Sequence, residues 1–167
     1  MAFDAFLQIE GLQGDSTDAN HKHSIEITGY NLAATQSISR TASSAGGATA
    51  GRIYLSDFSI TKLVDAATPK LLAACCSGQH FKKATLSVYR AGGDKQKYME
   101  VTFENFIVSG FYSGNIFDAL PSAFPEDVVW FSYSKIKMTY SQQSRANGQM
   151  IGQVVAGWDQ ERNTTYA

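Results

Sequence analysis

Alternation of apolar and polar residues with a period of two is the feature that most constrains this chain. Between residues 3 and 10, the apolar side chains fall on alternate positions: Phe3, Ala5, Leu7 and Ile9. Similar patterns recur at residues 25–30, 52–64, 84–90, 98–108 and 128–140. Successive side chains of a strand point to opposite faces, so this pattern is typical of half-buried strands. The chain is therefore expected to be mainly β.

One segment departs from this pattern. The sequence DAATPKLLAACCSG predicts a helix at about residues 68–77, with Thr68 as N-cap, Pro69 as first helical residue and Gly78 as stop signal. The residues expected to form its buried stripe are Leu71, Leu72, Cys75 and Cys76. A helix of about three turns is marginal alone, so it should pack on a sheet.

The apolar phase slips inside three of the long β patterns. In one of them, the inward positions change phase between Leu55 and Phe58, which predicts a bend near Ser56 and Asp57. Comparable slips follow Phe103 and Tyr133, and the segment 91–94 is a hairpin turn signal. Long bent strands are typical of closed or coiled sheets. The predicted fold is mainly β: a compact β-barrel or sandwich with one short flanking α-helix, forming a single domain over residues 1–167.

The composition limits the class of partner. Charged residues make up 17% of the chain, below the roughly 25% of ordinary domains, and the net charge is −1. Such a balance gives no basis for binding nucleic acid. Burying charges costs desolvation free energy, so a surface poor in charge suits coverage by other copies of the chain.

The sequence also predicts in which compartment of the cell the protein is made. No run approaches the eighteen or so apolar residues of a membrane helix, so no membrane insertion is expected. The start lacks a basic region and carries Asp4 and Glu10, which predicts synthesis in the cytoplasm without a cleaved signal peptide. Cys75 and Cys76 are adjacent and are expected to stay reduced.

Candidate chemical sites are weak. His21 and His23 could share a metal on one side of a strand, but no further ligands follow with suitable spacing. A nucleophilic role for Cys75 or Cys76 would need a histidine such as His80. Two carboxylate pairs can be proposed for hydrolysis, namely Glu100 with Glu104 and Glu126 with Asp127. Scattered carboxylates on strands usually face solvent, and no glycine run completes a nucleotide motif. We expect no enzyme activity, metal or cofactor.

Several segments, in order, resemble the haemolysin-coregulated protein (Hcp) family of type VI secretion systems. The strand-and-helix segment LSDFSITKLVDAATPKLLAACCSGQHF is the most specific of them. The others are AFLQIEGLQGDSTDANHK, HSIEITGYNLAATQS, LSVYRAGGDKQKYMEVTFENFIVSGFYSG, SYSKIKMTYSQQ and AGWDQERNT. The resemblance implies a compact two-sheet β-barrel with one short flanking α-helix, assembled into a homo-hexameric ring.

The resemblance further implies that rings stack into a tube inside a contractile sheath. The tube is then capped by a VgrG spike and secreted through the type VI apparatus, with effectors carried in the lumen as part of virulence.

In such an assembly, the functional residues are contact residues. Residues 37–51 form a long Ser-, Thr-, Ala- and Gly-rich loop, which is the candidate for ring stacking. Its candidate residues are Arg40, Ser43, Ser44, Gly46, Gly47 and Thr49. Segment 115–131 is more hydrophobic than expected for the family, and Tyr30 stands where members commonly have tryptophan. Phe117, Leu120 and Phe124 could cover a neighbouring subunit or the lumen, or pack on their own sheet.

Two other functions compete with the tube subunit. One is a monomeric β-barrel that binds a small molecule, with aromatic side chains such as Trp130 and Trp158 lining a cavity. The other is a hydrolase based on Cys75 or Cys76 with His80. The oligomeric state separates the first alternative from a tube subunit, and a Cys-to-Ser change tests the second.

Overall fold

The computed structural model describes residues 3–39, 50–91, 95–115 and 124–167. Within these ranges the chain forms eleven strands and one helix. They are β1 (Phe3–Ile9), β2 (Ile25–Ile27), β3 (Gly29–Asn31), β4 (Ala34–Ile38), β5 (Ala50–Leu55), β6 (Phe58–Leu63), α1 (Thr68–Ser77), β7 (His80–Arg90), β8 (Lys97–Gly114), β9 (Glu126–Gln143), β10 (Met150–Asp159) and β11 (Thr164–Thr165). The predicted mainly-β class with one short helix is confirmed.

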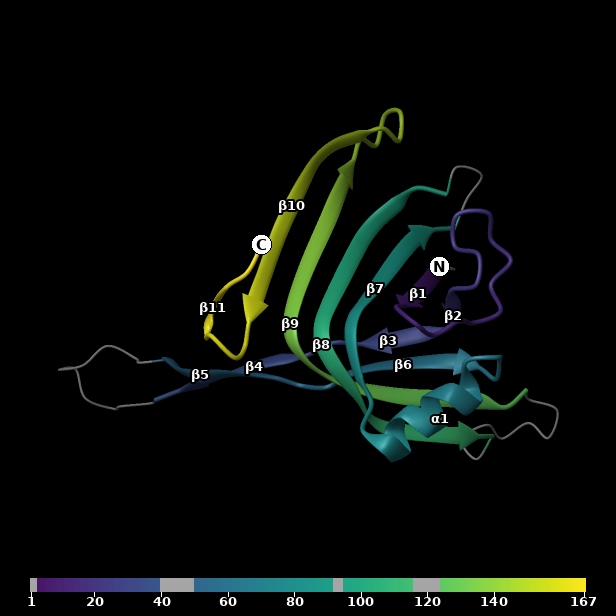
Figure 1. Ribbon diagram of the computed structural model, residues 1–167. Coiled ribbons are helices and arrows are strands. Elements are labelled where there is room, and N and C mark those ends of the chain that lie inside the picture. Colours follow the sequence, from purple (N-terminus) through teal and green to yellow (C-terminus); the bar gives the residue numbers. More distant parts are fainter. Residues whose placement is uncertain (1–2, 40–49, 92–94, 116–123) are drawn as a thin grey trace.

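A single curved antiparallel sheet dominates the molecule (Figure 1). Its strands follow the order β11-β10-β9-β8-β7-β1-β2. The long strand β9 bends and takes part in two layers. Its first half pairs with β6, from Leu63 opposite Glu126 to Phe58 opposite Phe131, and its second half pairs with β10. Strand β9 therefore connects the main sheet to the smaller layer formed by β6 and β3.

In the part of the chain that the structure describes, the sheets do not close into the predicted β-barrel. Among the described residues, β2 pairs with β1, and β6 pairs with β3 and β9. The three-residue strand β2 passes into β3 at Thr28, whose amide donates to the carbonyl of Thr61 at 2.8 Å. The two sides of the fold therefore meet at a short turn rather than along a ladder, while β10 and β11 extend outward.

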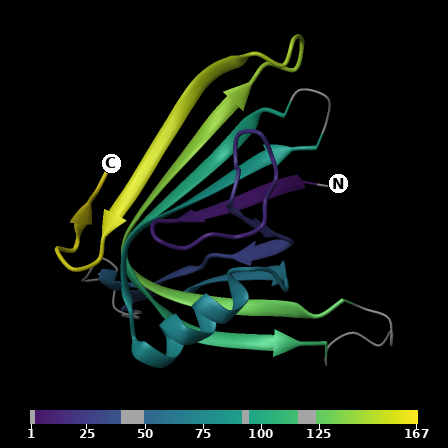
Figure 2. The ribbon, with the colours of Figure 1, turned by 45° about the vertical axis from the view of Figure 1, so that its right-hand side comes forward.

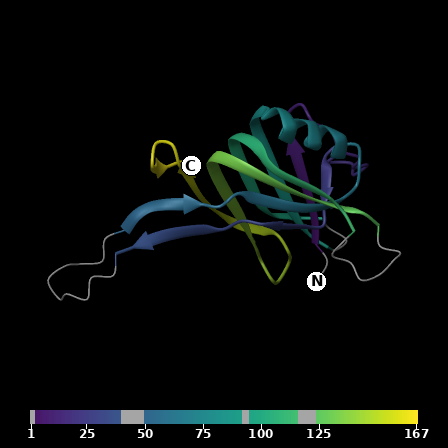
Figure 3. The same ribbon diagram turned by 90° about the horizontal axis from the view of Figure 1, so that it is seen from below.

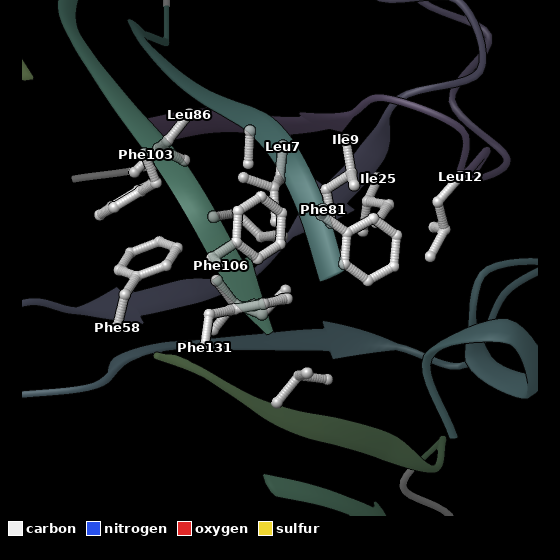
Figure 4. Close-up of a cluster of buried hydrophobic side chains, with 14 of the residues drawn as sticks. Leu7, Ile9, Leu12, Ile25, Phe58, Phe81, Leu86, Phe103, Phe106 and Phe131 are labelled. Atoms are coloured by element: carbon white, nitrogen blue, oxygen red, sulfur yellow. The ribbon is translucent and has the colours of Figure 1, made fainter. Parts of the chain in front are cut away.

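Aromatic side chains fill the space between the main sheet and the layer that covers it (Figure 4). The rings of Phe58 and Phe103 stack with their centroids 4.3 Å apart, and those of Phe81 and Phe106 stack at 5.2 Å. Leu7 and other inward residues of β1 complete this core. Burial of these rings is the main favourable term that holds the layers together.

The predicted phase slips correspond to bends. Strand β5 ends at Leu55 and β6 begins at Phe58, which confirms the bend at residues 56 and 57. In β8, Asn105 has a positive φ of 51°, and the ladder to β9 shifts between Val108 and Gly110. Because of the irregular backbone at Asn105, Phe103 and Phe106 both point into the core although they are three positions apart.

Helix α1 lies against β8 (Figure 2), with the predicted bounds. Gly78 ends it with a left-handed φ of 65°, and its amide donates to Ala74. The N-cap is Ala67 rather than the predicted Thr68, which is the first residue of the helix and whose hydroxyl accepts a hydrogen bond from the amide of Asp65.

The predicted stripe of α1 is correct only in part. Leu71 is buried and Cys75 is half-buried, whereas Leu72 and Cys76 are exposed. The buried face of α1 includes Ala74, which was not predicted to be buried. This face is therefore rotated about the helix axis relative to the predicted stripe.

Candidate interaction surfaces

Strands β4 and β5 project from the body as a hairpin (Figures 1 and 3). All β4 side chains are exposed, including Ile38 at 60%, and Tyr54 on β5 is 63% exposed. A two-stranded hairpin without a covering layer is marginally stable in water. The hairpin therefore offers a surface suited to contact with another molecule.

The root of this hairpin is anchored to the body. The amide and the hydroxyl of Ser56 both donate to the carbonyl of Ala33, at 3.0 and 2.9 Å. The guanidinium of Arg52 donates to the carbonyl of Gln160 at 2.7 Å, which links β5 to the end of β10. These bonds fix the direction in which the hairpin leaves the body.

The six residues predicted for ring stacking, at positions 40, 43, 44, 46, 47 and 49, lie outside the described residues. Strand β4 leads toward that segment and β5 leads away from it. Its two flanking residues, Ser39 and Ala50, therefore lie at the far end of the projecting hairpin.

An apolar cavity of about 280 Å³ opens between the hairpin root and strands β9 and β10. We call it the apolar socket, and it is lined by Leu32, Ala33, Ala34, Leu55, Ile136, Met138, Ala156, Gly157 and Trp158. None of these residues is charged. The indole nitrogen of Trp158 is buried and has no hydrogen-bond acceptor among the described residues. The socket thus suits an apolar side chain.

A second apolar surface lies where β9 begins. Phe124 is 65% exposed, and Leu63 and Val64 at the end of β6 are also exposed. The amide of Val64 donates to the carbonyl of Pro125 at 3.3 Å, and Leu63 pairs with Glu126, so the backbone segments that carry these three exposed residues lie side by side. We call Leu63, Val64 and Phe124 the apolar knob. Phe117 and Leu120, predicted with Phe124 as contact residues, lie outside the described residues.

A buried ion-pair network holds the backbone beside the knob. The ammonium group of Lys62 is fully buried and lies 2.7 Å from a carboxylate oxygen of Asp127 and 2.7 Å from one of Asp65. It also donates to the hydroxyl of Thr68 at 3.0 Å. Burial favours a higher pKa for Asp127, but hydrogen bonds from Lys62, Ser113 and Thr68 outweigh it and lower the pKa. The network joins β6, β9 and the start of α1.

Sequence reasoning missed this network, although a signal was present. Lys62 continues the inward phase of Phe58 and Ile60, and a charged residue at an inward position calls for a buried partner. Asp127 was considered only as one of a carboxylate pair.

The face of the main sheet opposite the core is polar. One row of paired residues crosses four strands with alternating charge, in the order Lys83, Glu104, Lys135 and Asp159. The hydroxyl of Tyr166 donates a hydrogen bond to the carboxylate of Glu104. The ammonium group of Lys135 lies 5.1 Å from the centroid of the Tyr166 ring. The hydrogen bond to Glu104 raises the pKa of Tyr166. The two faces of the sheet therefore offer different chemistry to a partner.

Two of the residues considered for catalysis or metal binding, His21 and Asp127, are engaged by neighbouring side chains, whereas His23, Cys76 and His80 are exposed. The ring of His21 stacks on buried Phe6 with centroids 4.5 Å apart, and its Nε2 lies 2.5 Å from the Tyr89 hydroxyl. Burial lowers the pKa of His21. Asp127 is engaged by Lys62. Within the described ranges, no group of three or more His, Cys, Asp or Glu residues is placed to hold a metal ion.

None of the helices in the described part of the chain is long and apolar enough to span a membrane.

Comparison with known proteins identifies relatives along nearly the whole chain. The family model described as "Type VI secretion system effector, Hcp" matches residues 6–140. The protein hcp1 of Pseudomonas aeruginosa strain PAO1 is 30% identical over 164 residues, which cover 98% of each chain.

Solved structures agree with this match. A structure described as that of a type six secretion system protein superposes with a TM-score of 0.90 at 28% identity, covering 99% of this chain and 100% of the other. Hcp1 from Salmonella typhimurium gives a TM-score of 0.77 at 26% identity, with coverage of 99% and 100%.

Proposed function

The chain belongs to the Hcp family of type VI secretion proteins, and from this membership we propose that it is the ring-forming subunit of a secretion tube. The family consists of secreted, tube-forming structural proteins rather than enzymes. Contact surfaces therefore take the place that a catalytic centre would hold.

In the proposed assembly, six copies close into a ring and rings stack within a contractile sheath. A VgrG spike caps the tube, effectors travel in its lumen, and the protein leaves the cell through the type VI apparatus without a cleaved signal peptide. Closing a ring requires two different, complementary surfaces on each subunit. The low content of charged residues supports extensive contacts between copies.

The observation that carries the proposal is the projecting β4–β5 hairpin. Strand β4 is exposed throughout and β5 is exposed except at half-buried Ile53 and Leu55, yet the root of the hairpin is fixed by Ser56 and Arg52. A rigidly rooted, uncovered ribbon that carries the segment 40–49 is suited to reach a neighbouring ring. We propose that this hairpin mediates stacking.

Replacement of residues 40–49 by a short Gly-Ser turn tests the stacking role. We expect hexamers to persist in native mass spectrometry while longer tubes disappear from electron micrographs. A variant in which 40–49 is replaced by a Gly-Ser segment of equal length separates the effect of sequence from that of length. Loss of the hexamer would refute the assignment to stacking, and tubes of unchanged length would show that residues 40–49 are not needed for it.

Light scattering coupled to size exclusion on the unmodified, reduced protein tests ring formation itself. A species of six subunits is expected. A stable monomer at all concentrations would instead favour a monomeric small-molecule binder.

A further inference from the structure

The apolar socket and the apolar knob are built from different parts of the fold, the socket from the root of the β4–β5 hairpin with β9 and β10, and the knob from residues at the end of β6 and just before β9. The root of the hairpin and the start of β9 lie apart in the ribbon (Figures 1 and 3). We propose that copies of this chain join head to tail within the ring, with the knob of one copy seated in the socket of the next. This inference rests on the proposed ring-forming function and names the residues that would make its lateral contact.

The socket lies on the core face of the main sheet, where no second layer covers the described residues. One row of paired residues runs across the sheet on its core face, from Leu7 through Leu86, Val101 and Met138 to Ala156. Leu7, Leu86 and Val101 are buried, Met138 is partly buried, and Ala156 is exposed. The covering layer thus ends before the sheet does. Another molecule that covers Ala156 and its neighbours would extend the core without rearranging it.

The chemistry of the socket restricts its occupant. Its volume of about 280 Å³ is near the lower end for ligand pockets, so it accommodates one or two side chains rather than a large ligand. None of its lining residues is charged, so the occupant that it favours is apolar.

The knob matches this chemistry and is held rigidly. Phe124 offers a 65%-exposed aromatic ring beside Leu63 and Val64. The buried pair of Lys62 and Asp127 fixes the strand ends next to it. Rigid aromatic anchors lose little conformational entropy on binding, so they contribute strongly to an interface.

The charges beside the two surfaces are complementary. Arg52 lies on β5 near the socket, with its guanidinium at the carbonyl of Gln160. Glu126 is exposed beside the knob and pairs with Leu63. Opposite charges at the rims favour one orientation of approach.

A second copy is the occupant that these features favour. The chain itself carries both the uncharged cavity and the exposed apolar patch that fits it, and a tube requires every subunit to bind others of its kind. Because the two surfaces differ and lie apart, their contact is heterologous, which is the type that closes rings.

Two single variants test the contact. Phe124→Glu removes the knob and leaves the socket intact, whereas Ala156→Glu blocks the socket and leaves the knob intact. Both positions are exposed, so both variants should fold. Leu72→Glu, at an exposed position of α1 outside both surfaces, is the matched control. At a concentration where the unmodified protein forms rings, native mass spectrometry should show each knob or socket variant at 18.2 kDa and the control as a ring.

Mixing the two variants gives the decisive result. The intact knob of the Ala156→Glu chain can enter the intact socket of the Phe124→Glu chain, and neither chain can then add another. The mixture should form a one-to-one heterodimer with twice the mass of one chain, while each variant alone at the same total concentration stays monomeric.

Two results would overturn the proposal while leaving the ring-forming function in place. They are normal rings from either variant, and the absence of a heterodimer from the mixture. Heterodimers of the unmodified chain with an added effector or spike protein, with no rings, would assign the socket to a foreign partner. An unmodified chain that stays monomeric would overturn the ring-forming function itself.

Discussion

Lys62 is a fully buried charged side chain, so its ammonium group depends on neighbouring residues for hydrogen bonds. Its ammonium group has no exposed surface and depends on two carboxylates, one hydroxyl and one carbonyl for its hydrogen bonds. Removing one member of a buried ion pair leaves the other charge without compensation, which costs far more free energy than breaking an exposed pair. The network therefore determines how firmly β6, β9 and α1 are joined.

Lys62→Met should lower the free energy of unfolding by about 3–5 kcal/mol, because Asp127 would remain buried without its partner. Denaturant unfolding at one fixed protein concentration measures this. Lys97→Met removes an exposed lysine that pairs with Glu100 and should cost about 1 kcal/mol or less. Adding Asp127→Leu to Lys62→Met should recover part of the loss, and equal effects of the two lysine changes would contradict the buried role.

The lowered pKa of Asp127 makes the stability of the fold sensitive to acid. The folded pKa lies below the ordinary value of 3.8, so the carboxylate stabilises the fold fully above that value. This contribution is lost as the pH falls through the folded pKa. Unfolding experiments between about pH 5 and pH 2 should show a smaller loss of stability for Asp127→Asn than for the unmodified protein. Parallel curves for the two proteins would show that Asp127 is not the sensitive group.

Among the elements, β10 depends on a glycine to hold the short strand β11. A Cβ added at Gly157 would lie 1.7 Å from the carbonyl oxygen of Tyr166, too close for the two segments to keep their positions. The amide of Tyr166 donates to the carbonyl of Gly157 at 3.0 Å. The absence of a side chain therefore lets the end of the chain lie against β10, with the ring of Tyr166 near Lys135.

Gly157→Ala should displace β11 and also disturb the local pairing of β10 with β9, because the added Cβ would lie 2.7 Å from the carbonyl oxygen of Ile136. Hydrogen exchange at the amide of Tyr166 should become faster by about tenfold or more, equivalent to ~1.4 kcal/mol of local stability. Gly152→Ala on the same strand is the control, because its Cβ would have no neighbour nearer than 4.0 Å. Equal exchange rates in the two variants would show that β11 is not held by this close approach.

Considered as a whole, the molecule has apolar contact surfaces with few charges. The socket lining is uncharged, and the charged rim residues Arg52 and Glu126 are exposed, where salt screens them. Assembly should therefore depend mainly on apolar burial.

Raising the salt concentration from about 50 mM to about 500 mM should change the apparent dissociation constant of the ring by less than about threefold. Light scattering over a dilution series at each concentration measures this, with the Leu72→Glu variant treated in parallel. A decrease in affinity of tenfold or more in salt would show that ion pairs, rather than apolar contacts, hold the ring together.

The sequence by itself determined the local features of this protein. Period-two alternation predicted the strands, Pro69 and Gly78 marked the helix, and the phase slip before Phe58 predicted a bend. Each of these depends on the backbone preferences and side-chain directions of neighbouring residues, which short segments of sequence specify.

Only the tertiary structure decided which of the predicted faces are covered. Leu86 and Ala156 occupy the same row on the same face of the sheet, yet one is buried and the other exposed. Alternation assigns a residue to a face, but burial depends on whether a distant segment reaches it. The same reason explains why the barrel was predicted and is not closed, and why the pairing of Lys62 with Asp127, 65 positions apart, was missed.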